Sequence, residues 1–207
     1  MIITRQVSKQ TIGKGKAGSA RERFTIALRA NAGKFGLELQ PSVVGRLGVY
    51  YEILQKWNPR LHLVSSCSPE EFAVRHVLES LWILRYLPDG SRIIDIGSGG
   101  GLPIVPCLIT RDDLTATLIE SSRRKSVFLR EALRISGALD RSQLIVDRFE
   151  QIKPPPTDFI SCRALDRFPQ MLPKLIDWAP ANSTLLPELI PGSERRFLIV
   201  ASSTRPS

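Results

Sequence analysis

Cysteine and histidine are scarce in this sequence, and their number and spacing exclude two kinds of site. The three cysteines, Cys67, Cys107 and Cys162, are odd in number, lie far apart and form no CxxC pair. This pattern argues against a disulfide framework and against a zinc site, and we expect no metal. Free cysteines are typical of a reducing compartment, so we expect a cytoplasmic protein.

Long hydrophobic runs are also missing. No apolar run approaches the ~18 residues of a membrane-spanning helix, and the first residues, MIITRQVSKQ, lack the continuous apolar segment of a secretory signal. The 207 residues are 43% hydrophobic and 24% charged, which is normal for one globular domain with an extension. We expect a monomer without a membrane partner.

Acidic residues are nearly absent from residues 1–35, where Glu22 is the single acid among eight lysines and arginines. Most of the net charge of +9 therefore lies in this segment, which we interpret as a basic, flexible arm, with a short helix at 20–31. Such arms often bind nucleic acid, and Lys14 and Lys16 are candidate RNA contacts. A solvated tail without a partner, or an organellar transit peptide, are the alternatives.

The segment 36–90 is predicted to form a helical cap. From Pro41, apolar residues recur at steps of three and four, which predicts a helix up to the breaker Asn58-Pro59. Ser68-Pro69-Glu70-Glu71 has the pattern of a helix start, with a capping serine, a proline and two acids in the first turn. This second helix is expected to end near Leu87.

Strands and helices alternate in the remaining segment, 91–207. Strands are predicted at 92–97, 115–120, 143–148, 158–163 and 195–202, and helices at 103–110, 123–136 and 168–179. Alternation of this kind predicts an α/β fold with a doubly wound, mostly parallel sheet. The whole chain is then a helical cap followed by an α/β core.

A glycine-rich stretch, RIIDIGSGGGLPIVP, follows the first predicted strand of the core. Its glycines are Gly97, Gly99, Gly100 and Gly101. Leu102 occupies the third glycine position of the dinucleotide pattern, and no lysine follows as a P-loop requires. The remaining pattern, G-x-G-x-G, resembles motif I of class I methyltransferases that use S-adenosylmethionine (SAM). In that motif the loop backbone lies close to the methionine and ribose parts of the cofactor, which makes Gly97, Gly99 and Gly101 candidate cofactor contacts.

Glu120 supports a nucleoside site because it ends the second strand of the core. A carboxylate at this position can accept hydrogen bonds from both ribose hydroxyls. NAD-binding proteins share this feature, so Glu120 indicates a nucleoside without identifying it.

Further motifs around the loop resemble one methyltransferase family. They are YYEILQKWNPRLHLV (50–64), RHVLESL (75–81), DIGSGGGLPIVP (95–106), LIESSRRKSVFLREAL (118–133), DRFEQI (147–152) and ISCRALDRFPQML (160–172). In order and spacing they resemble the bacterial small-subunit ribosomal RNA guanine-N7 methyltransferases, the GidB family. The resemblance covers roughly residues 40–180 and implies a class I SAM-dependent methyltransferase fold.

The resemblance also implies a reaction and its residues: transfer of a methyl group from SAM to N7 of a guanine in small-subunit (16S) ribosomal RNA. By position it implies SAM contacts at Gly97, Leu102, Phe149, Glu150 and Arg163. The residues themselves agree for Phe149, whose ring can lie against the adenine, and for Glu150, which follows a strand end.

Three residues depart from the family pattern, together with one segment. The family usually has asparagine at His62, aspartate at Glu79 and glycine at Ile104. The segment TLLPELIPGSERRFLIVAS is shorter than the family leads us to expect before the last strand.

Methylation at N7 needs no general base, because this nitrogen carries a free lone pair at neutral pH. Catalysis can then consist mainly of positioning, and Arg163 is the candidate positioning residue. Ser161-Cys162-Arg163-Ala164 lacks the motif of amino-directed methyltransferases. Cys162 raises the alternative of pyrimidine C5 chemistry, but we interpret it as a core residue. His76 can serve as a base in principle, and we favour a structural role for RHVLESL.

Arg123, Arg124 and Lys125 open a predicted helix, where positive charge is unfavourable for the helix dipole. This placement indicates contacts with RNA phosphates, with a solvated turn as the alternative. The expected partner is small-subunit ribosomal RNA or the small ribosomal subunit. Two other functions stay open: a non-catalytic RNA-binding or ribosome-assembly protein with the same fold, and a SAM methyltransferase with another acceptor.

Overall fold

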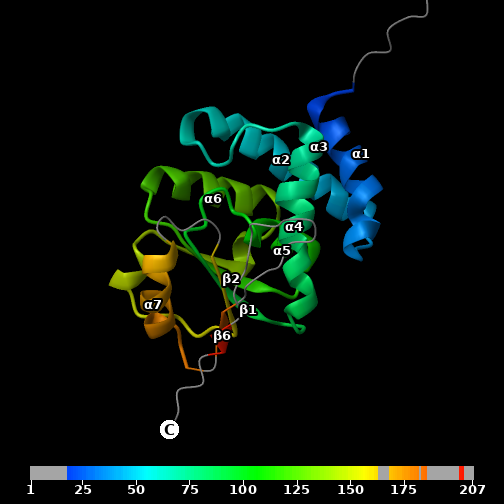
Figure 1. The fold of residues 1–207 in the computed structure, drawn as a ribbon. Coiled ribbons are helices and arrows are strands. Elements are labelled where there is room, and N and C mark those ends of the chain that lie inside the picture. The colour runs from blue at the N-terminus through cyan, green and yellow to red at the C-terminus, as the bar shows by residue number, and fades with distance from the viewer. Residues whose placement is uncertain (1–17, 163–167, 182, 186–200, 203–207) are drawn as a thin grey trace, which may run out of the picture.

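Six strands form one sheet in the structure, a computed structural model that describes residues 18–162, 168–181, 183–185 and 201–202. The strands are β1 (Arg92–Ile96), β2 (Thr115–Ile119), β3 (Ser142–Ile145), β4 (Phe159–Cys162), β5 (Thr184–Leu185) and β6 (Ala201–Ser202). Their order is β3-β2-β1-β4-β5-β6, and every pair is parallel except β5 and β6. The predicted α/β fold with a mostly parallel sheet is confirmed (Figure 1).

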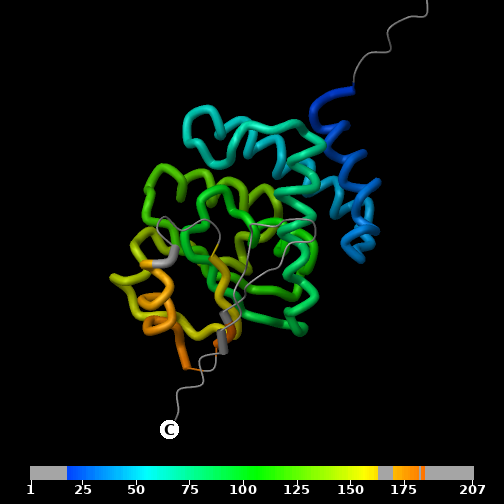
Figure 2. Tube along the Cα trace, viewed as in Figure 1, coloured from blue at the N-terminus to red at the C-terminus, as the bar shows by residue number. Residues whose placement is uncertain are grey.

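The helices cover both faces of this sheet. They are α1 (Ala20–Ala32), α2 (Pro41–Leu61), α3 (Pro69–Phe72), α4 (Glu79–Leu81), α5 (Ile104–Thr110), α6 (Arg123–Ile135) and α7 (Phe168–Trp178). Short helical turns occur at η1 (Gly33–Phe35), η2 (Ala73–Leu78), η3 (Trp82–Tyr86), η4 (Leu139–Arg141) and η5 (Phe149–Gln151). Figure 2 traces the chain from α1, in blue, through the helical cap, in light blue to green, and into the sheet and its flanking helices.

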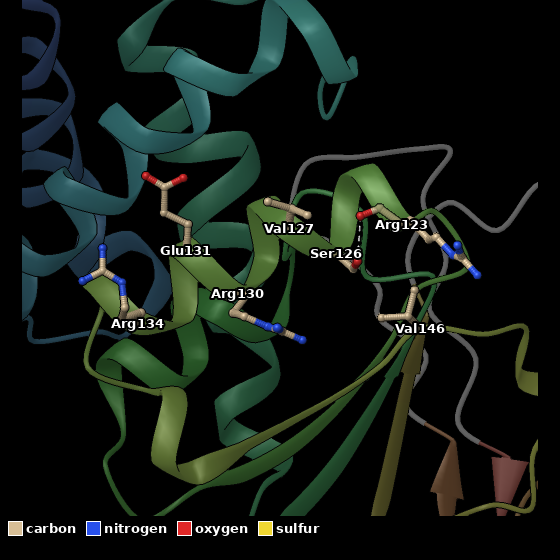
Figure 3. Close-up of a pocket in the computed structure, with 7 residues that line it drawn as sticks. All are labelled: Arg123, Ser126, Val127, Arg130, Glu131, Arg134 and Val146. Carbon is tan, nitrogen blue, oxygen red and sulfur yellow. Dashed lines mark hydrogen bonds between the residues drawn. The ribbon is translucent and has the colours of Figure 1, made fainter.

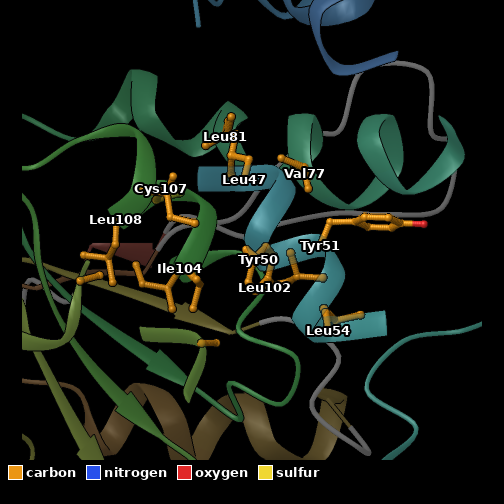
Figure 4. Packing of buried hydrophobic residues seen from close by; sticks show 14 of the residues in the cluster. Leu47, Tyr50, Tyr51, Leu54, Val77, Leu81, Leu102, Ile104, Cys107 and Leu108 are labelled. Carbon is orange, nitrogen blue, oxygen red and sulfur yellow. The ribbon is translucent and has the colours of Figure 1, made fainter. Parts of the chain in front are cut away.

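Two hydrophobic clusters lie on opposite faces of the sheet, because successive strand residues point to opposite sides. On one face Ile93 packs in a large cluster that contains side chains of α1, α2, α5 and α6. On the other face Ile94 and Ile96 pack with Leu175 of α7. Figure 4 shows how Leu47, Tyr50 and Leu54 of α2 share the large cluster with Ile104, Cys107 and Leu108 of α5.

The prediction of a flexible arm over residues 1–35 is wrong from Ser19 onward, although the predicted short helix is confirmed as α1. Ser19 caps α1 and forms a capping box with Glu22, which satisfies backbone donors at the helix start. Phe24 and Leu28 of α1 are fully buried, and the Phe24 ring stacks on Tyr51 at 4.6 Å. The apolar face of α1 therefore fixes this segment on the cap. Lys14 and Lys16 lie outside the described residues.

The expectation that α2 ends at Asn58-Pro59 is also wrong, because the helix runs to Leu61. Pro59 lies in the last turn, so most of the helix precedes it, and the chain keeps its helical path for the two residues that follow. His62 then ends the helix in the left-handed region, with φ 49°, and its N–H donates to the Asn58 carbonyl. The departure from the family at His62 thus falls where asparagine is favoured for its backbone conformation.

The second predicted helix begins as expected and changes its winding along its length. The Ser68 hydroxyl accepts a hydrogen bond from the Glu71 N–H at 3.1 Å. The helical path continues to Tyr86, close to the expected end at Leu87, but η2 is wound as a π-helix and η3 as a 3₁₀-helix. Local spacing predicted the helix and its cap but not the change of winding. In the structure η2 packs against α1, and α4 packs against α5.

Two of the predicted strands differ from the described ones. The third strand was expected at 143–148, but β3 pairs with β2 only up to Ile145, opposite the last residue of β2. Pairing ends there because β2 offers no further strand residue. Of the predicted strand 195–202, the structure describes only Ala201–Ser202, and the rest lies outside the described residues.

The cap is attached to the glycine loop by a buried hydrogen bond. The Tyr50 hydroxyl of α2 donates to the carbonyl of Gly100 at 2.6 Å, and Tyr50 is 1% exposed. A second bond joins Trp57 Nε1 of α2 to Glu131 Oε2 of α6 at 2.8 Å. The cap and the core share one hydrophobic cluster. The division of the chain into a cap (36–90) and a core (91–207) stays a prediction.

Among the helices that the structure describes, none is both long enough and apolar enough to cross a membrane.

We predict that Tyr50→Phe lowers the free energy of unfolding by about 1–3 kcal/mol, because the buried Gly100 carbonyl loses its donor. Urea unfolding measures the change. Tyr86→Phe is the matched control: this side chain is 47% exposed, so a change below about 0.5 kcal/mol is expected. Equal midpoints for Tyr50→Phe and the parent protein would contradict the proposed anchoring.

Candidate functional site

The glycine loop bends sharply where β1 ends. Gly97, Gly99 and Gly101 have φ values of 69°, 48° and 79°, a left-handed region that side chains rarely adopt. At Gly101 a Cβ atom would also lie 2.6 Å from Val105 Cγ2. Gly101 is therefore required for packing of the loop on α5, while Gly97 is exposed at the carboxyl edge of the sheet.

The Glu120 carboxylate joins this loop to the loop after β2. Its Oε2 accepts a hydrogen bond from the Gly99 N–H and its Oε1 from the Ser122 N–H, each at 2.8 Å. The residue is only 6% exposed. Each carboxylate oxygen has about two acceptor sites, so each retains one for a further donor. These two free acceptor sites fit a pair of ribose hydroxyls as donors, which is the role that the sequence predicts for Glu120.

A second acidic residue, Asp95 of β1, contacts both β4 and the glycine loop. Its Oδ1 accepts a hydrogen bond from the Ser161 hydroxyl of β4 at 2.7 Å, and its backbone carbonyl accepts one from the Ser98 hydroxyl at 2.9 Å. Asp95 is 1% exposed. Neither Asp95 nor Tyr50 was predicted to have a role. The signal for Asp95 was an acidic residue inside the otherwise apolar strand.

Phe149 and Glu150 follow β3, in η5. The Phe149 ring is 4% exposed and packs edge-on against Trp178, with 5.5 Å between the ring centroids. The ring offers little exposed surface for a contact with an adenine. Glu150 is exposed. The cofactor role of both residues stays a prediction.

Leu102 and Ile104 lie at the transition from the loop to α5. Leu102 is 8% exposed and Ile104 is fully buried in the large cluster. The departure from the family at Ile104 thus adds an apolar side chain to the core at the first residue of α5. A cofactor contact at Leu102 stays a prediction, and its side chain offers little exposed surface for it.

Cys162 is a core residue, as predicted. It is 9% exposed and belongs to the smaller hydrophobic cluster, beside Ile96 and Ile160. Burial, with a smaller effect of the Asp95 charge, raises the pKa of the Cys162 thiol to about 12. A thiolate nucleophile for pyrimidine C5 chemistry is disfavoured, because the thiol stays protonated near neutral pH.

The predicted RNA contacts lie at the start of α6. Arg123 and Arg124 are exposed and Lys125 is half-buried. Of the three, Arg123 lines a groove along α6 (Figure 3). Arg163, the candidate positioning residue, lies outside the described residues.

The RHVLESL segment lies in the cap. The Arg75 guanidinium bonds the Glu71 carboxylate, and the His76 ring packs on Phe72 with 5.0 Å between centroids. Glu79 is 7% exposed. These contacts favour the structural role that we expected for this segment.

Comparison with known proteins agrees with these motifs. A sequence model of the family described as rRNA small subunit methyltransferase G, GidB, matches residues 44–185, more than half of the chain. The chain belongs to the GidB family. The resemblance inferred from the motifs is therefore confirmed.

Curated GidB relatives match part of the chain. The ribosomal RNA small subunit methyltransferase G of Ruegeria pomeroyi is 39% identical over 124 residues, which are 58% of this chain and 60% of the relative. The protein of the same name from Gluconobacter oxydans is 41% identical over 135 residues, which are 65% of this chain and 66% of the relative. The chain thus matches less than two thirds of the length of these relatives.

The solved structures show the fold. An O-methyltransferase from Bacillus cereus, crystallised in complex with SAH, aligns with a TM-score of 0.50 at 21% identity. The alignment covers 79% of this chain and 70% of that one. The predicted class I methyltransferase fold is confirmed.

We predict that Cys162 resists alkylation in the folded protein. With a pKa of about 12, only about one thiol in ten thousand is ionised at pH 8, and the side chain is buried. Iodoacetamide labelling followed by mass spectrometry measures the modification of each cysteine, with the urea-unfolded protein as the control for full labelling. Rapid labelling of Cys162 without urea would contradict its assignment as a buried thiol.

Proposed function

We propose that this protein transfers a methyl group from SAM to N7 of a guanine in small-subunit (16S) ribosomal RNA. Membership of the GidB family carries this proposal. The Glu120 carboxylate, with an acceptor site left on each oxygen at the glycine loop, supports the nucleoside site that the cofactor needs. The matched relatives are named ribosomal RNA small subunit methyltransferase G.

The residues at the carboxyl edge of the sheet fit SAM. When bound, SAM supplies a methyl group activated by its sulfonium. Glu120 would accept hydrogen bonds from the two ribose hydroxyls while it keeps those from the backbone N–H groups of Gly99 and Ser122. The exposed backbone at Gly97 would lie beside the cofactor, with Leu102, Phe149 and Glu150 as further contacts.

The chain's own contribution to the reaction is positioning. Guanine N7 attacks with its lone pair, so no side chain has to remove a proton first. The buried thiol of Cys162 takes no part as a nucleophile, because it stays protonated. We propose Arg163 as the residue that orients the guanine, through hydrogen bonds that its guanidinium can donate to O6.

Two rival functions are weighed against this one. A non-catalytic RNA-binding or ribosome-assembly protein would have no need of a carboxylate with free acceptor sites at the loop. A SAM methyltransferase with another acceptor would share the cofactor site, and family membership disfavours it.

The proposed partner is small-subunit ribosomal RNA, free or within the small subunit. We also propose a cytoplasmic location, which the free thiols Cys67, Cys107 and Cys162 support because they are typical of a reducing compartment, and a monomeric state.

Methyl transfer tests the proposal directly. We expect labelled SAM to modify 16S ribosomal RNA, or small subunits, from cells that lack the modification. Borohydride reduction followed by aniline should then cleave the RNA at one guanine. Label without cleavage would refute N7 as the target, and no incorporation into either substrate would refute the function.

We further predict that Glu120→Gln weakens SAM binding roughly 10- to 100-fold. The amide has one acceptor oxygen, and its NH₂ group would face one of the two backbone donors, Gly99 or Ser122. Calorimetric titration measures the affinity, and a thermal unfolding curve verifies the fold. Glu38→Gln, at an exposed position of the cap, is the control and should bind as the parent does. Parent-like affinity of Glu120→Gln would exclude Glu120 from the cofactor site.

A further inference from the structure

A groove of about 590 Å³ runs along the exposed face of α6. Its lining residues are Arg123, Ser126, Val127, Arg130, Glu131, Arg134 and Val146. All but Val146 come from α6, at spacings of three and four that place them on one helix face. In Figure 3, Arg123 and Arg134 stand at opposite ends of this face, with Arg130 between them.

The three arginines of the groove are exposed. None of them forms an ion pair with a residue in the part of the chain that the structure describes. The other arginines of that part include several that do, such as Arg23 with Glu70 and Arg111 with Asp113. The α6 groove therefore carries a row of cations that have no ion-pair partner among the described residues.

The groove contains one carboxylate among its seven lining residues, Glu131. Its Oε2 accepts the hydrogen bond from Trp57 Nε1, and in Figure 3 the side chain points away from Arg130. Glu131 thus serves to attach α2 to α6, and the groove keeps an excess of positive charge.

The row of arginines begins beside the proposed cofactor site. Arg123 is the first residue of α6, and the preceding Ser122 donates its N–H to Glu120. From there the cations extend along the helix for roughly 16 Å, at about 1.5 Å per residue. A polyanion that follows this row would lead directly to the proposed cofactor site.

We propose that the α6 groove binds the phosphate backbone of the RNA strand that carries the target guanine. The proposal rests on the function proposed above and extends it from Arg123 to Arg130 and Arg134. Three guanidiniums in a row complement successive phosphates. Val127 and Val146, 58% and 38% exposed, offer apolar contacts to sugars or unstacked bases. Arg123 then gains an anionic partner that offsets its repulsion by the helix dipole.

The test uses Arg130→Ala/Arg134→Ala, two residues outside the proposed cofactor site. RNA affinity is measured by fluorescence anisotropy with unmodified 16S RNA at several salt concentrations. We expect binding to weaken about tenfold or more, and the slope of log affinity against log salt to fall by about 1.4, or 0.7 per lost phosphate contact. In the methyl-transfer assay the KM for RNA should rise while kcat at saturating RNA and the affinity for SAM stay unchanged.

Two further variants separate this role from a general loss of charge. Arg130→Lys/Arg134→Lys keeps both charges and should recover most of the affinity. Lys153→Ala/Lys174→Ala removes the same charge from exposed positions after η5 and on α7, and should change the affinity and salt slope much less.

The possible results distinguish a failure of the groove proposal from a failure of the proposed function. The groove proposal would be overturned if Arg130→Ala/Arg134→Ala left the RNA affinity unchanged, or if Lys153→Ala/Lys174→Ala lowered it equally. An acidic protein surface would then remain as the candidate occupant of the groove. A parent protein that binds RNA through the groove but methylates none would refute the proposed function alone. A parent protein that binds no RNA would refute both.

Discussion

The proposed cofactor site at the carboxyl edge of the sheet depends on the hydrogen bonds of the Glu120 carboxylate. This carboxylate accepts backbone hydrogen bonds from Gly99 and Ser122 and so holds the loop after β1 against the start of α6. Burial of a carboxylate costs much free energy unless hydrogen-bond donors surround it, and here the backbone supplies two N–H donors. The same geometry leaves acceptor sites for a ribose, so the carboxylate is oriented before a ligand arrives. Preorganisation of this kind lowers the cost of binding.

The cap supports the loop from the other side. Tyr50 bonds the Gly100 carbonyl, and a Cβ at Gly100 would lie only 3.4 Å from the Leu63 carbonyl oxygen. The loop therefore lies between β1 and the cap. Since Trp57 also joins α2 to α6, the cap contacts both the cofactor loop and the helix of the arginine groove. Cofactor and RNA sites are thus proposed on one packed unit.

The sequence was sufficient to predict the features that depend on local pattern. The glycine loop and the position of Glu120 after β2 follow from residue spacing and strand pattern. The burial of Cys162 follows from the frequent burial of free cysteines. The bonds of Tyr50 to Gly100 and of Glu120 to Gly99 join residues that are 50 and 21 positions apart, and no local pattern encodes them. Local signals were misleading at Pro59, after which the chain stays helical for two more residues, and in α1, where buried Phe24 outweighs the basic composition.

Calorimetric titration with SAM, and with an analogue that lacks both ribose hydroxyls, tests the central claim most directly. If Glu120 holds the ribose, SAM binds, and the analogue binds about tenfold or more weakly because two hydrogen bonds to a charged group are lost. Equal affinity for the two compounds would contradict the account, because the carboxylate at the loop would then have no part in holding the cofactor.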